Sequence, residues 1–385
     1  MPTSSPGPPT RSWTSSASVA IQRPPAWRRS RRRWRGSPLE RVTSLRHAAG
    51  SRAVTVAHTL AELGWSAFFA DQCRPDEADL VPQRVATVHR ARMGALAEAG
   101  PVKLMLPVHT NTGDYAVGDW VLVEAGTQML RRCLDRRTVL ERRREGSVAP
   151  QLAAANVDTL FIVTSCNADF NPTRLERYLA LANQGGAEPV IVLTKADAAV
   201  DAERYRREAG ALQRDLAVTL VNPRESGAAT QLGPWCGPGR TVAVVGSSGV
   251  GKSTLVNTLA GPSHAAPQAT GGIREHDAKG RHTTTSRSLH AIAGGGWVID
   301  TPGIRSLQLG DAAEGIDTLF AEITELAPEC RFRDCTHAHE PGCAVQAAVA
   351  EGRLDAERVA RWRILRAENR GNTVVPTGPR GNKRR

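Results

Sequence analysis

Short apolar runs alternate with segments of helical periodicity from about residue 155 onward. Runs of this length, bounded by turn residues, are typical of strands that are buried on both faces by the helices between them. The alternation therefore predicts a doubly wound parallel sheet whose ligand sites lie at the carboxyl ends of its strands. The predicted strands are 160–163, 189–193, 217–221, 242–245 and 297–299, and the predicted helices are 172–183, 201–215 and 252–260.

A different pattern precedes this sheet, with short β-like runs separated by Gly, Asn and Asp turns. Strands spaced so closely predict a small OB-like β-barrel, a fold whose face can bind single-stranded or looped RNA. A short helix is predicted at 58–63, where Gly64 ends it and the chain leads into the barrel. The predicted strands of the barrel are 84–88, 102–108, 120–123 and 129–134.

After residue 310 the pattern becomes helical, with a helix predicted at 355–369. Both ends of the chain are basic and poor in aliphatic residues, so they cannot build a core. The fold class is therefore multidomain, with an OB-like β-barrel, an α/β domain and a small helical domain. We expect a disordered basic tail at 1–50, the lead and barrel at 51–147, the α/β domain at 148–312, the helical domain at 313–370 and a basic tail at 371–385.

The net charge of +12 suits a nucleic-acid partner, but the charge is not evenly spread. Residues 1–50 hold ten Arg and one acid, and 371–385 hold four basic residues and no acid, which leaves −1 for 51–370. Any RNA-binding surface must therefore come from the tails or from local clusters. The Arg-rich run at 28–35 leaves four interpretations open: a contact with RNA, a solvated tail, a transit peptide, or upstream sequence that is never translated.

One local basic cluster, at the end of the predicted barrel, is the best candidate for phosphate contacts in the body of the chain. A solvated face is the alternative. The cluster consists of Arg131, Arg132, Arg136, Arg137, Arg142, Arg143 and Arg144, against Asp135 and Glu141. No apolar run is long enough to span a membrane, so we expect no membrane partner.

A phosphate-binding loop follows the predicted strand 242–245. It fits G-x-x-x-x-G-K-[ST] and lies between a strand and a helix, as this motif requires. Its glycines let backbone N–H groups point at a phosphate tail, and the helix N-terminus adds partial positive charge. Lys252 is predicted to reach the outer phosphates and act in catalysis, and the Ser253 hydroxyl to ligate Mg²⁺. The nucleotide-binding residues here are Gly246, Ser247, Ser248, Gly249, Val250, Gly251, Lys252, Ser253 and Thr254.

Two further segments extend this nucleotide site. Asp300 ends the strand 297–299, where an acid can hold Mg²⁺ through water, and the Gly303 N–H can meet a γ-phosphate. The segment 280–285 resembles a switch in which Thr284 closes on the metal when the γ-phosphate is present. Together with the phosphate loop, these segments predict a nucleoside triphosphate site with Mg²⁺.

The segment Thr194, Lys195, Ala196 and Asp197 resembles the Asn-Lys-x-Asp motif with which GTPases bind guanine. Asp197 would accept two hydrogen bonds from the base, and the Lys195 stem would pack on the ring. Adenine would leave Asp197 unpaired, which disfavours an ATP-using protein. A polar strand end whose Asp caps the next helix is the alternative, which the companion motifs disfavour. This segment precedes the phosphate loop, whereas ordinary Ras-like GTPases place it last, so the order indicates circular permutation.

Three cysteines and a histidine cluster near the C-terminus with the spacing C-x4-C-x-H-x5-C. Such donors suit one closed, structural Zn²⁺ site, in which His339 is an alternative to His337. The predicted ligands are Cys330, Cys335, His337 and Cys343. The scattered cysteines, predicted to be buried small hydrophobes, are Cys73, Cys133, Cys166 and Cys236.

Together these motifs resemble the RsgA family, the circularly permuted GTPases of bacterial small-subunit ribosome assembly. The segments that carry the resemblance are 116–121, 154–158, 246–253, 280–285, 300–303 and the Cys/His set with 340–342. The resemblance implies an OB barrel, a circularly permuted P-loop GTPase domain and a zinc-binding domain that grip the 30S subunit and its 16S rRNA. It also implies hydrolysis of GTP with Mg²⁺, stimulated by 30S, in a cytoplasmic protein that we expect to be a monomer.

The sequence departs from the family pattern at several positions. Thr194 replaces the usual Asn, whose side chain braces the phosphate loop, and this predicts weaker guanine affinity. Residues 222–223 stand where a Ser-Ala element of the base pocket is usual. Ile304 follows Gly303 where Ras-like enzymes hold a water-orienting Gln, so His282 becomes the candidate catalytic group. An exposed loop position is the alternative for His282, and a nucleotide-toggled 30S-binding module with negligible turnover is the alternative function.

Overall fold

The structure is a computed structural model that describes residues 57–142, 151–225, 227–261, 288–300 and 311–372. The chain divides into two compact units, and all of these residues belong to the second unit, Val54–Arg385. Within the described residues, no helix has both the length and the apolar character needed to cross a membrane.

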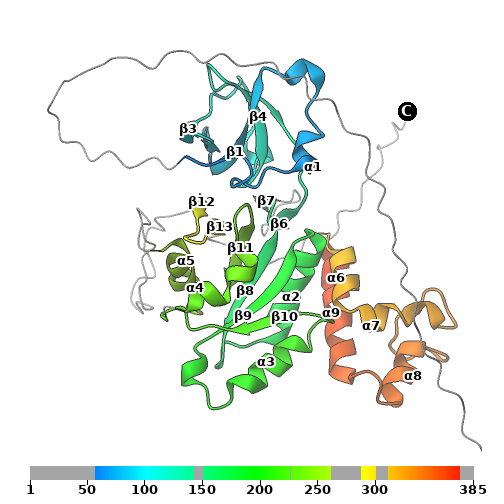
Figure 1. The fold of residues 1–385 in the computed structure, drawn as a ribbon. Helices are drawn as coiled ribbons and strands as arrows, with labels where there is room; N and C mark the ends of the chain where they lie inside the picture. Colours follow the sequence, from blue (N-terminus) through cyan, green and yellow to red (C-terminus); the bar gives the residue numbers. More distant parts are fainter. Residues whose placement is uncertain (1–56, 143–150, 226, 262–287, 301–310, 373–385) are drawn as a thin grey trace, which may run out of the picture. The chain divides into compact units, whose positions relative to one another are not determined.

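A parallel sheet forms the centre of this unit (Figure 1). Its strands, in the order β10-β9-β8-β11-β13, are β8 (Thr159–Ser165), β9 (Glu188–Thr194), β10 (Ala217–Leu220), β11 (Thr241–Gly246) and β13 (Trp297–Asp300). Leu160 and Ile162 of β8 share a core with α2 (Pro172–Gln184) and α3 (Ala202–Gly210). Phe161 and Val163 share another core with α4 (Ala228–Gln231) and α5 (Lys252–Ala260). Because successive side chains of a strand face opposite ways, each apolar run fills both layers, and the predicted doubly wound sheet is confirmed.

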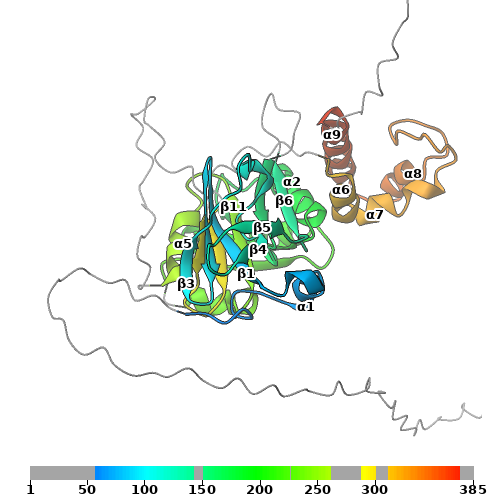
Figure 2. The ribbon, with the colours of Figure 1, turned by 90° about the horizontal axis from the view of Figure 1, so that it is seen from above.

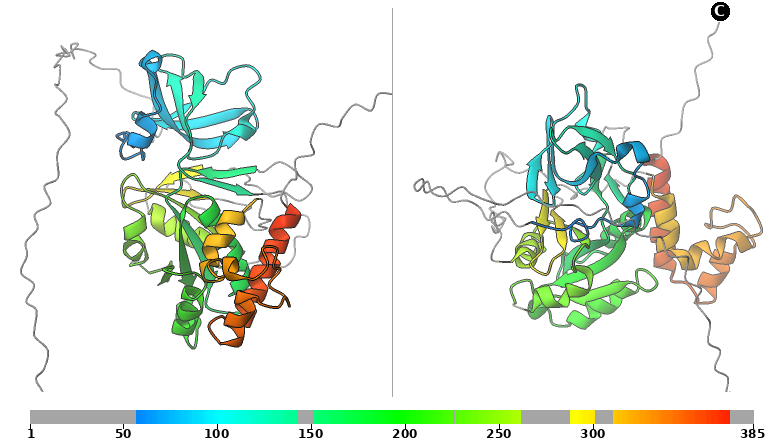
Figure 3. Two further views of the ribbon diagram at one scale, coloured as in Figure 1. Left: turned by 90° about the vertical axis from the view of Figure 1, so that its right-hand side faces the viewer. Right: turned by 45° about the horizontal axis from the view of Figure 1, so that its top comes forward.

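Five strands before this sheet pair as a small barrel, as predicted (Figure 3). They are β1 (Leu80–His89), β2 (Arg92–Ala97), β3 (Gly100–Lys103), β4 (Trp120–Glu124) and β5 (Leu130–Cys133). β1 pairs with β2 and β4, β2 pairs with β3, and β4 pairs with β5. A bridge between Met105 and Met129 closes the ring. The sequence does not signal β2, because Arg92–Ala97 contains no β-branched residue.

The barrel is connected to the parallel sheet through hydrogen-bonded strands. Thr87 of β1 pairs with Ser288 of β12 (Ser288–Ala291), and β12 pairs antiparallel with β13. A separate hairpin of β6 (Val139–Arg142) and β7 (Gln151–Ala155) lies between β5 and β8 in the chain. The strand that ends at Asp300 is therefore one strand removed from the barrel.

The C-terminal helices are α6 (Ala313–Leu319), α7 (Ala321–Thr324), α8 (Ala344–Ala350) and α9 (Ala356–Asn372), and they confirm the predicted helical region. α6 packs against α2, and α9 packs against α6 (Figure 2). Arg358 and Arg361 of α9 both pair with Glu176 of α2. One residue further along α2, Arg177 pairs with Glu368. α2 thus connects the sheet to the C-terminal helices.

Four local predictions are wrong. The strand predicted at 102–108 is instead β3 (Gly100–Lys103), beyond which only Met105 forms a bridge, since Pro107 cannot donate to a strand ladder. The helix predicted at 58–63 is a hydrogen-bonded turn at 60–64, where Gly64 enters the left-handed region (φ +93°) and redirects the chain toward α1 (Ala67–Ala70). α3 ends at Gly210 rather than at residue 215, since glycine favours a helix end. Among the scattered cysteines, Cys166 and Cys236 are buried as predicted, whereas Cys73, which follows α1 at the surface, is exposed and Cys133 is half-buried.

Candidate functional site

The phosphate loop joins β11 to α5 in a conformation that glycine makes possible. Gly246 has φ +141°, and a Cβ there would lie 2.1 Å from the Val163 carbonyl oxygen. Gly251 has φ +98° and precedes α5 without a side-chain cap. The first N–H groups of α5 can therefore bind an anion, aided by the helix dipole.

Two cationic side chains converge on Ser247 in this loop. The Lys252 ammonium donates to the Ser247 carbonyl oxygen, and Nη1 of Arg174 donates to the Ser247 hydroxyl. Arg174 lies in the first turn of α2, and the strand before it, β8, pairs in parallel with β11. Both charges therefore lie at the carboxyl edge of the sheet, where an anionic ligand would bind. The sequence does not point to Arg174, because only strand pairing brings it here.

The segment predicted to bind guanine is in direct contact with the phosphate loop. The Thr194 hydroxyl lies 2.7 Å from the Val250 carbonyl oxygen and 3.2 Å from the Thr164 carbonyl oxygen. Thr194 is 1% exposed, so this contact is shielded from water. A threonine hydroxyl thus contacts the loop at this position, and the weaker guanine affinity that the replacement of Asn predicts stays a prediction.

The remaining residues of this segment turn out of the strand toward the surface. Lys195 adopts a left-handed conformation (φ +56°) and precedes a short 3₁₀ helix at Ala196–Ala198, which leaves Asp197 exposed. Pro223 lies beside the same loop, 3.9 Å from where a Cβ on Gly251 would be, and its carbonyl accepts the Thr258 hydroxyl at 2.6 Å. Pro223, one of the two residues that replace the usual Ser-Ala element, therefore lies beside the phosphate loop and α5.

The predicted metal and switch residues are described only in part. Asp300 ends β13, and its backbone pairs with Val244 of β11, two residues before the phosphate loop begins. Ser253 lies in the first turn of α5, at the same edge of the sheet. The Asp300 side chain and the residues His282, Thr284 and Gly303 lie outside the described residues, so their roles stay predictions.

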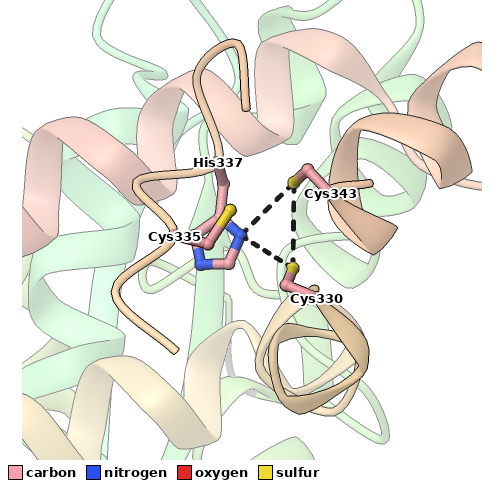
Figure 4. A group of neighbouring side chains, drawn as sticks. All are labelled: Cys330, Cys335, His337 and Cys343. Atoms are coloured by element: carbon pink, nitrogen blue, oxygen red, sulfur yellow. Dashed lines mark hydrogen bonds between the residues drawn. The ribbon is translucent and has the colours of Figure 1, made fainter. Parts of the chain in front are cut away.

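The cysteine and histidine cluster forms a compact group whose donor atoms all lie within 4.8 Å of one another (Figure 4). The sulfurs of Cys330 and Cys343 are 3.8 Å apart, and they lie 3.4 Å and 3.5 Å from Nδ1 of His337. A tetrahedron with Zn–S bonds of about 2.3 Å and Zn–N bonds of about 2.0–2.1 Å separates two sulfurs by about 3.8 Å and sulfur from nitrogen by about 3.5 Å. Together with Cys335, the donors therefore fit one structural Zn²⁺, and the nitrogen comes from His337 rather than the exposed His339.

Contacts outside this group hold its loop in place. The Thr336 hydroxyl and N–H donate to the Glu340 carboxylate, and these bonds hold the pKa of Glu340 well below its usual range. Gln346 of α8 donates to the His337 carbonyl oxygen at 2.6 Å, and the Trp362 ring of α9 lies 5.2 Å from the His337 ring. The candidate zinc site is thus tied to both α8 and α9.

The basic cluster at the end of the barrel has acidic partners. Arg131 pairs with Glu124, Arg132 with Glu77, Arg136 with Asp119 and Arg137 with Asp158. Arg142 donates to Gln151 at 2.9 Å, and Arg143 and Arg144 lie outside the described residues. A neighbouring carboxylate reduces the attraction of an arginine for phosphate, so the first four are weaker candidates for RNA contact than the sequence suggested.

Known proteins resemble this chain in sequence. A family model described as RsgA GTPase matches residues 133–310. The small ribosomal subunit biogenesis GTPase RsgA of Mesorhizobium japonicum is 67% identical over 332 residues, which cover 86% of this chain and 96% of that protein. The chain belongs to the RsgA GTPase family. A second member, small ribosomal subunit biogenesis GTPase RsgA 2 of Vibrio vulnificus, is 48% identical over 81% of this chain and 88% of its own length.

Two solved structures have a similar fold. YjeQ from Thermotoga maritima has a TM-score of 0.57 at 24% identity and covers 76% of this chain and 99% of its own. YloQ, a circularly permuted GTPase, has a TM-score of 0.55 at 22% identity and covers 79% of this chain and 99% of its own. These likenesses confirm the permuted RsgA GTPase fold that the order of the motifs predicted.

Proposed function

We propose that this chain hydrolyses GTP to GDP and phosphate, that the small ribosomal subunit stimulates the reaction, and that it acts in late 30S assembly. The observation that carries the proposal is the contact between the Thr194 hydroxyl and the Val250 carbonyl oxygen. Through it, the predicted base-recognition segment meets the phosphate loop, although it precedes that loop in the chain. The names of the relatives in Mesorhizobium japonicum and Vibrio vulnificus support the role in subunit biogenesis.

The nucleotide would be bound largely by backbone groups. N–H groups of the loop at 246–251 and of the first turn of α5 would surround the phosphates, with Lys252 compensating their charge. Asp197 would accept hydrogen bonds from guanine, and the Lys195 stem would cover the ring. The remaining GTP-binding residues are Thr194, Ala196, Ser253, Thr254, Asp300 and Gly303.

Mg²⁺ would be held by Ser253, Thr284 and Asp300, two of which come from elements that end or begin at the edge of the sheet where the phosphate loop lies. When bound, the ion neutralises charge on the phosphate oxygens. His282 would orient the attacking water, a role that Ile304 cannot take because its side chain is apolar.

Cys330, Cys335, His337 and Cys343 would hold one structural Zn²⁺, which would order the helical domain at 313–370. The barrel at 51–147 and this domain would contact the 30S subunit and its 16S rRNA on either side of the GTPase domain at 148–312. We further propose that the protein acts as a monomer in the cytoplasm, without a membrane partner, and that basic tails occupy 1–50 and 371–385.

The decisive experiment is phosphate release from GTP and from ATP by the full chain, titrated with purified 30S subunits. We expect hydrolysis of GTP alone, and a rate that rises with 30S until it saturates. His282→Ala should lose most of the stimulation while GDP binding is retained. GTP-dependent 30S binding without turnover above background would contradict the proposal and favour the nucleotide-toggled binding module.

Zinc content tests the second site. Elemental analysis of the purified chain should find one zinc per molecule, and Cys343→Ser should lower this content because only three ligands remain. GTP binding should persist in this variant, because the four ligands come from 330–343 and none belongs to the phosphate loop at 246–253. Full zinc content in Cys343→Ser would contradict the assignment.

A further inference from the structure

Arg174 reaches the phosphate loop from a segment that belongs to none of the predicted nucleotide-binding motifs. Its guanidinium Nη1 donates to the Ser247 hydroxyl, and the residue is half-buried. Asn171 caps α2 by accepting the Arg174 N–H at 2.9 Å, which fixes the first turn of the helix. Both the backbone and the head group of Arg174 are therefore held at the edge of the nucleotide site.

The partner of this charge is a neutral hydroxyl. Within the described residues, no carboxylate lies within 4.0 Å of the Arg174 guanidinium, whereas Arg177 on the same helix pairs with Glu368 at 2.6 Å. Hydrogen bonds between ionised groups are about twice as strong as those to neutral partners. The Arg174 guanidinium would therefore form a stronger hydrogen bond to an anion than to this hydroxyl. Phosphate is the anion that this loop can bind.

Arg174 and Thr194 contact different ends of the loop. Thr194 contacts Val250 near the end of the loop, beside the segment predicted to bind the base. Arg174 contacts Ser247 near its beginning. A nucleotide whose base lies at Asp197 would extend its phosphates away from Thr194, so the terminal phosphates are those within reach of Arg174.

The helix that carries Arg174 is firmly anchored. Glu176, in the same turn, is buried and pairs with both Arg358 and Arg361 at 2.9 Å. A charged group that stabilises a transition state acts best when its support is held by packing and hydrogen bonds, because little reorganisation is then needed.

We propose that Arg174 is an internal catalytic arginine that contacts the terminal phosphate oxygens of GTP and stabilises the charge that develops on them during hydrolysis. This inference rests on the proposed GTPase function. A water oxygen forms a bond to the γ-phosphorus, while the bond from that phosphorus to the β–γ bridging oxygen breaks and its electron pair stays on GDP. The water protons pass to phosphate and solvent. Arg174 transfers no proton in this step.

The test separates the chemical step from binding. Arg174→Ala should lower kcat for GTP, with and without 30S, by about 10²–10³-fold, the loss typical of removing one charge-stabilising donor. The Kd for GDP should change less than about 3-fold, because GDP lacks the γ-phosphate. Arg174→Lys should recover part of the rate, since it keeps the charge but not the planar fork. Arg206→Ala, which removes an exposed arginine of α3, is the matched control and should keep the wild-type rate.

Two further measurements exclude a role confined to shaping the loop. GDP with aluminium fluoride, which imitates the transferring phosphoryl group, should bind wild type more tightly than GDP alone, and Arg174→Ala should lose this difference. Ser247→Ala should reduce kcat far less than Arg174→Ala does. Equal losses in these two variants, or a wild-type kcat in Arg174→Ala, would overturn the inference and leave the GTPase function intact. No GTP turnover by wild type would instead refute the proposed function.

Discussion

Chemically different contacts join the GTPase core to its two neighbours. On the barrel side, Arg84 of β1 is fully buried and donates to the Leu63 carbonyl oxygen at 2.6 Å and the Thr241 hydroxyl at 2.7 Å. Within the described residues, no carboxylate lies within 4.0 Å of it. On the C-terminal side, buried Glu176 accepts from two arginines of α9. On the barrel side the buried cation contacts neutral acceptors, and Asp158 and Asp119 act on it only from a longer distance. On the C-terminal side opposite charges are in direct contact.

The difference shows that burial has separate consequences for a lone charge and for a paired one. Burial lowers the pKa of Arg84 to about 10, yet the guanidinium stays protonated at neutral pH and keeps its desolvation cost. Glu176 and its two arginines offset each other. Arg358 also pairs with Glu322 and Arg361 with Glu357, but Glu176 is the most buried of these carboxylates, so its loss removes the partner that both arginines share in the interior. We therefore expect a single substitution to lower the free energy of unfolding more at the contact between α2 and α9 than at Arg84.

The largest effect is expected for Glu176→Gln. It leaves the buried guanidinium of Arg358 and the partly buried one of Arg361 without their shared carboxylate, which should lower the free energy of unfolding by about 3–5 kcal/mol in urea titrations. Glu203→Gln is the matched control. It breaks an exposed pair with Arg206 and should cost less than about 1 kcal/mol. Similar costs for the two variants would remove the distinction between buried and exposed pairs.

A smaller effect is expected for Arg84→Met. The Leu63 and Asn156 carbonyls and the Thr241 hydroxyl lose a donor, at about 1–3 kcal/mol for each group left unsatisfied, but removal of a desolvated charge offsets part of this loss. Arg84→Lys tests the geometry, because one ammonium cannot reproduce the planar fork that spans these three acceptors. If Arg84→Met lowered the free energy of unfolding as much as Glu176→Gln does in the same titration, the expected difference between the two contacts would be wrong.

The sequence predicts the parts of this molecule in which chemistry fixes the residue type. Gly246 must be glycine because its Cβ would collide with a carbonyl oxygen, and the spacing of the zinc ligands follows from short loops. The contacts of Arg84, Arg174 and Glu176 could not be predicted. Their partners lie 157, 73 and 182 residues away, and an isolated charge in a strand or helix resembles any solvent-facing position. Only the pairing of β8 with β11 and the packing of α9 near α2 define these contacts.

The smallest effect on stability is expected for an ion pair close to the surface. Its carboxylate titrates, so its contribution depends on pH. Glu77 pairs with Arg132 of β5 and accepts the Arg74 N–H, and these bonds lower its pKa from 4.5 to about 2. Because the folded pKa lies below the unfolded one, the carboxylate contributes stability above about pH 4.5 and loses it as the pH falls through 2.

Glu77→Gln should therefore destabilise the chain at pH 7, and its difference from wild type should shrink between pH 4.5 and 2. The carboxyl carbon of Glu77, followed by NMR, should titrate near pH 2 in wild type, and Arg132→Gln should move that titration upward because the largest cause of the shift is gone. A Glu77 that titrates at its ordinary pH in wild type would contradict the ion pair. If Glu77 titrated at the same pH in Arg132→Gln as in wild type, the lowered pKa would instead be caused by the hydrogen bond from the Arg74 N–H. In either case, carboxylate–arginine pairing would not govern stability near the barrel surface as it does at α9.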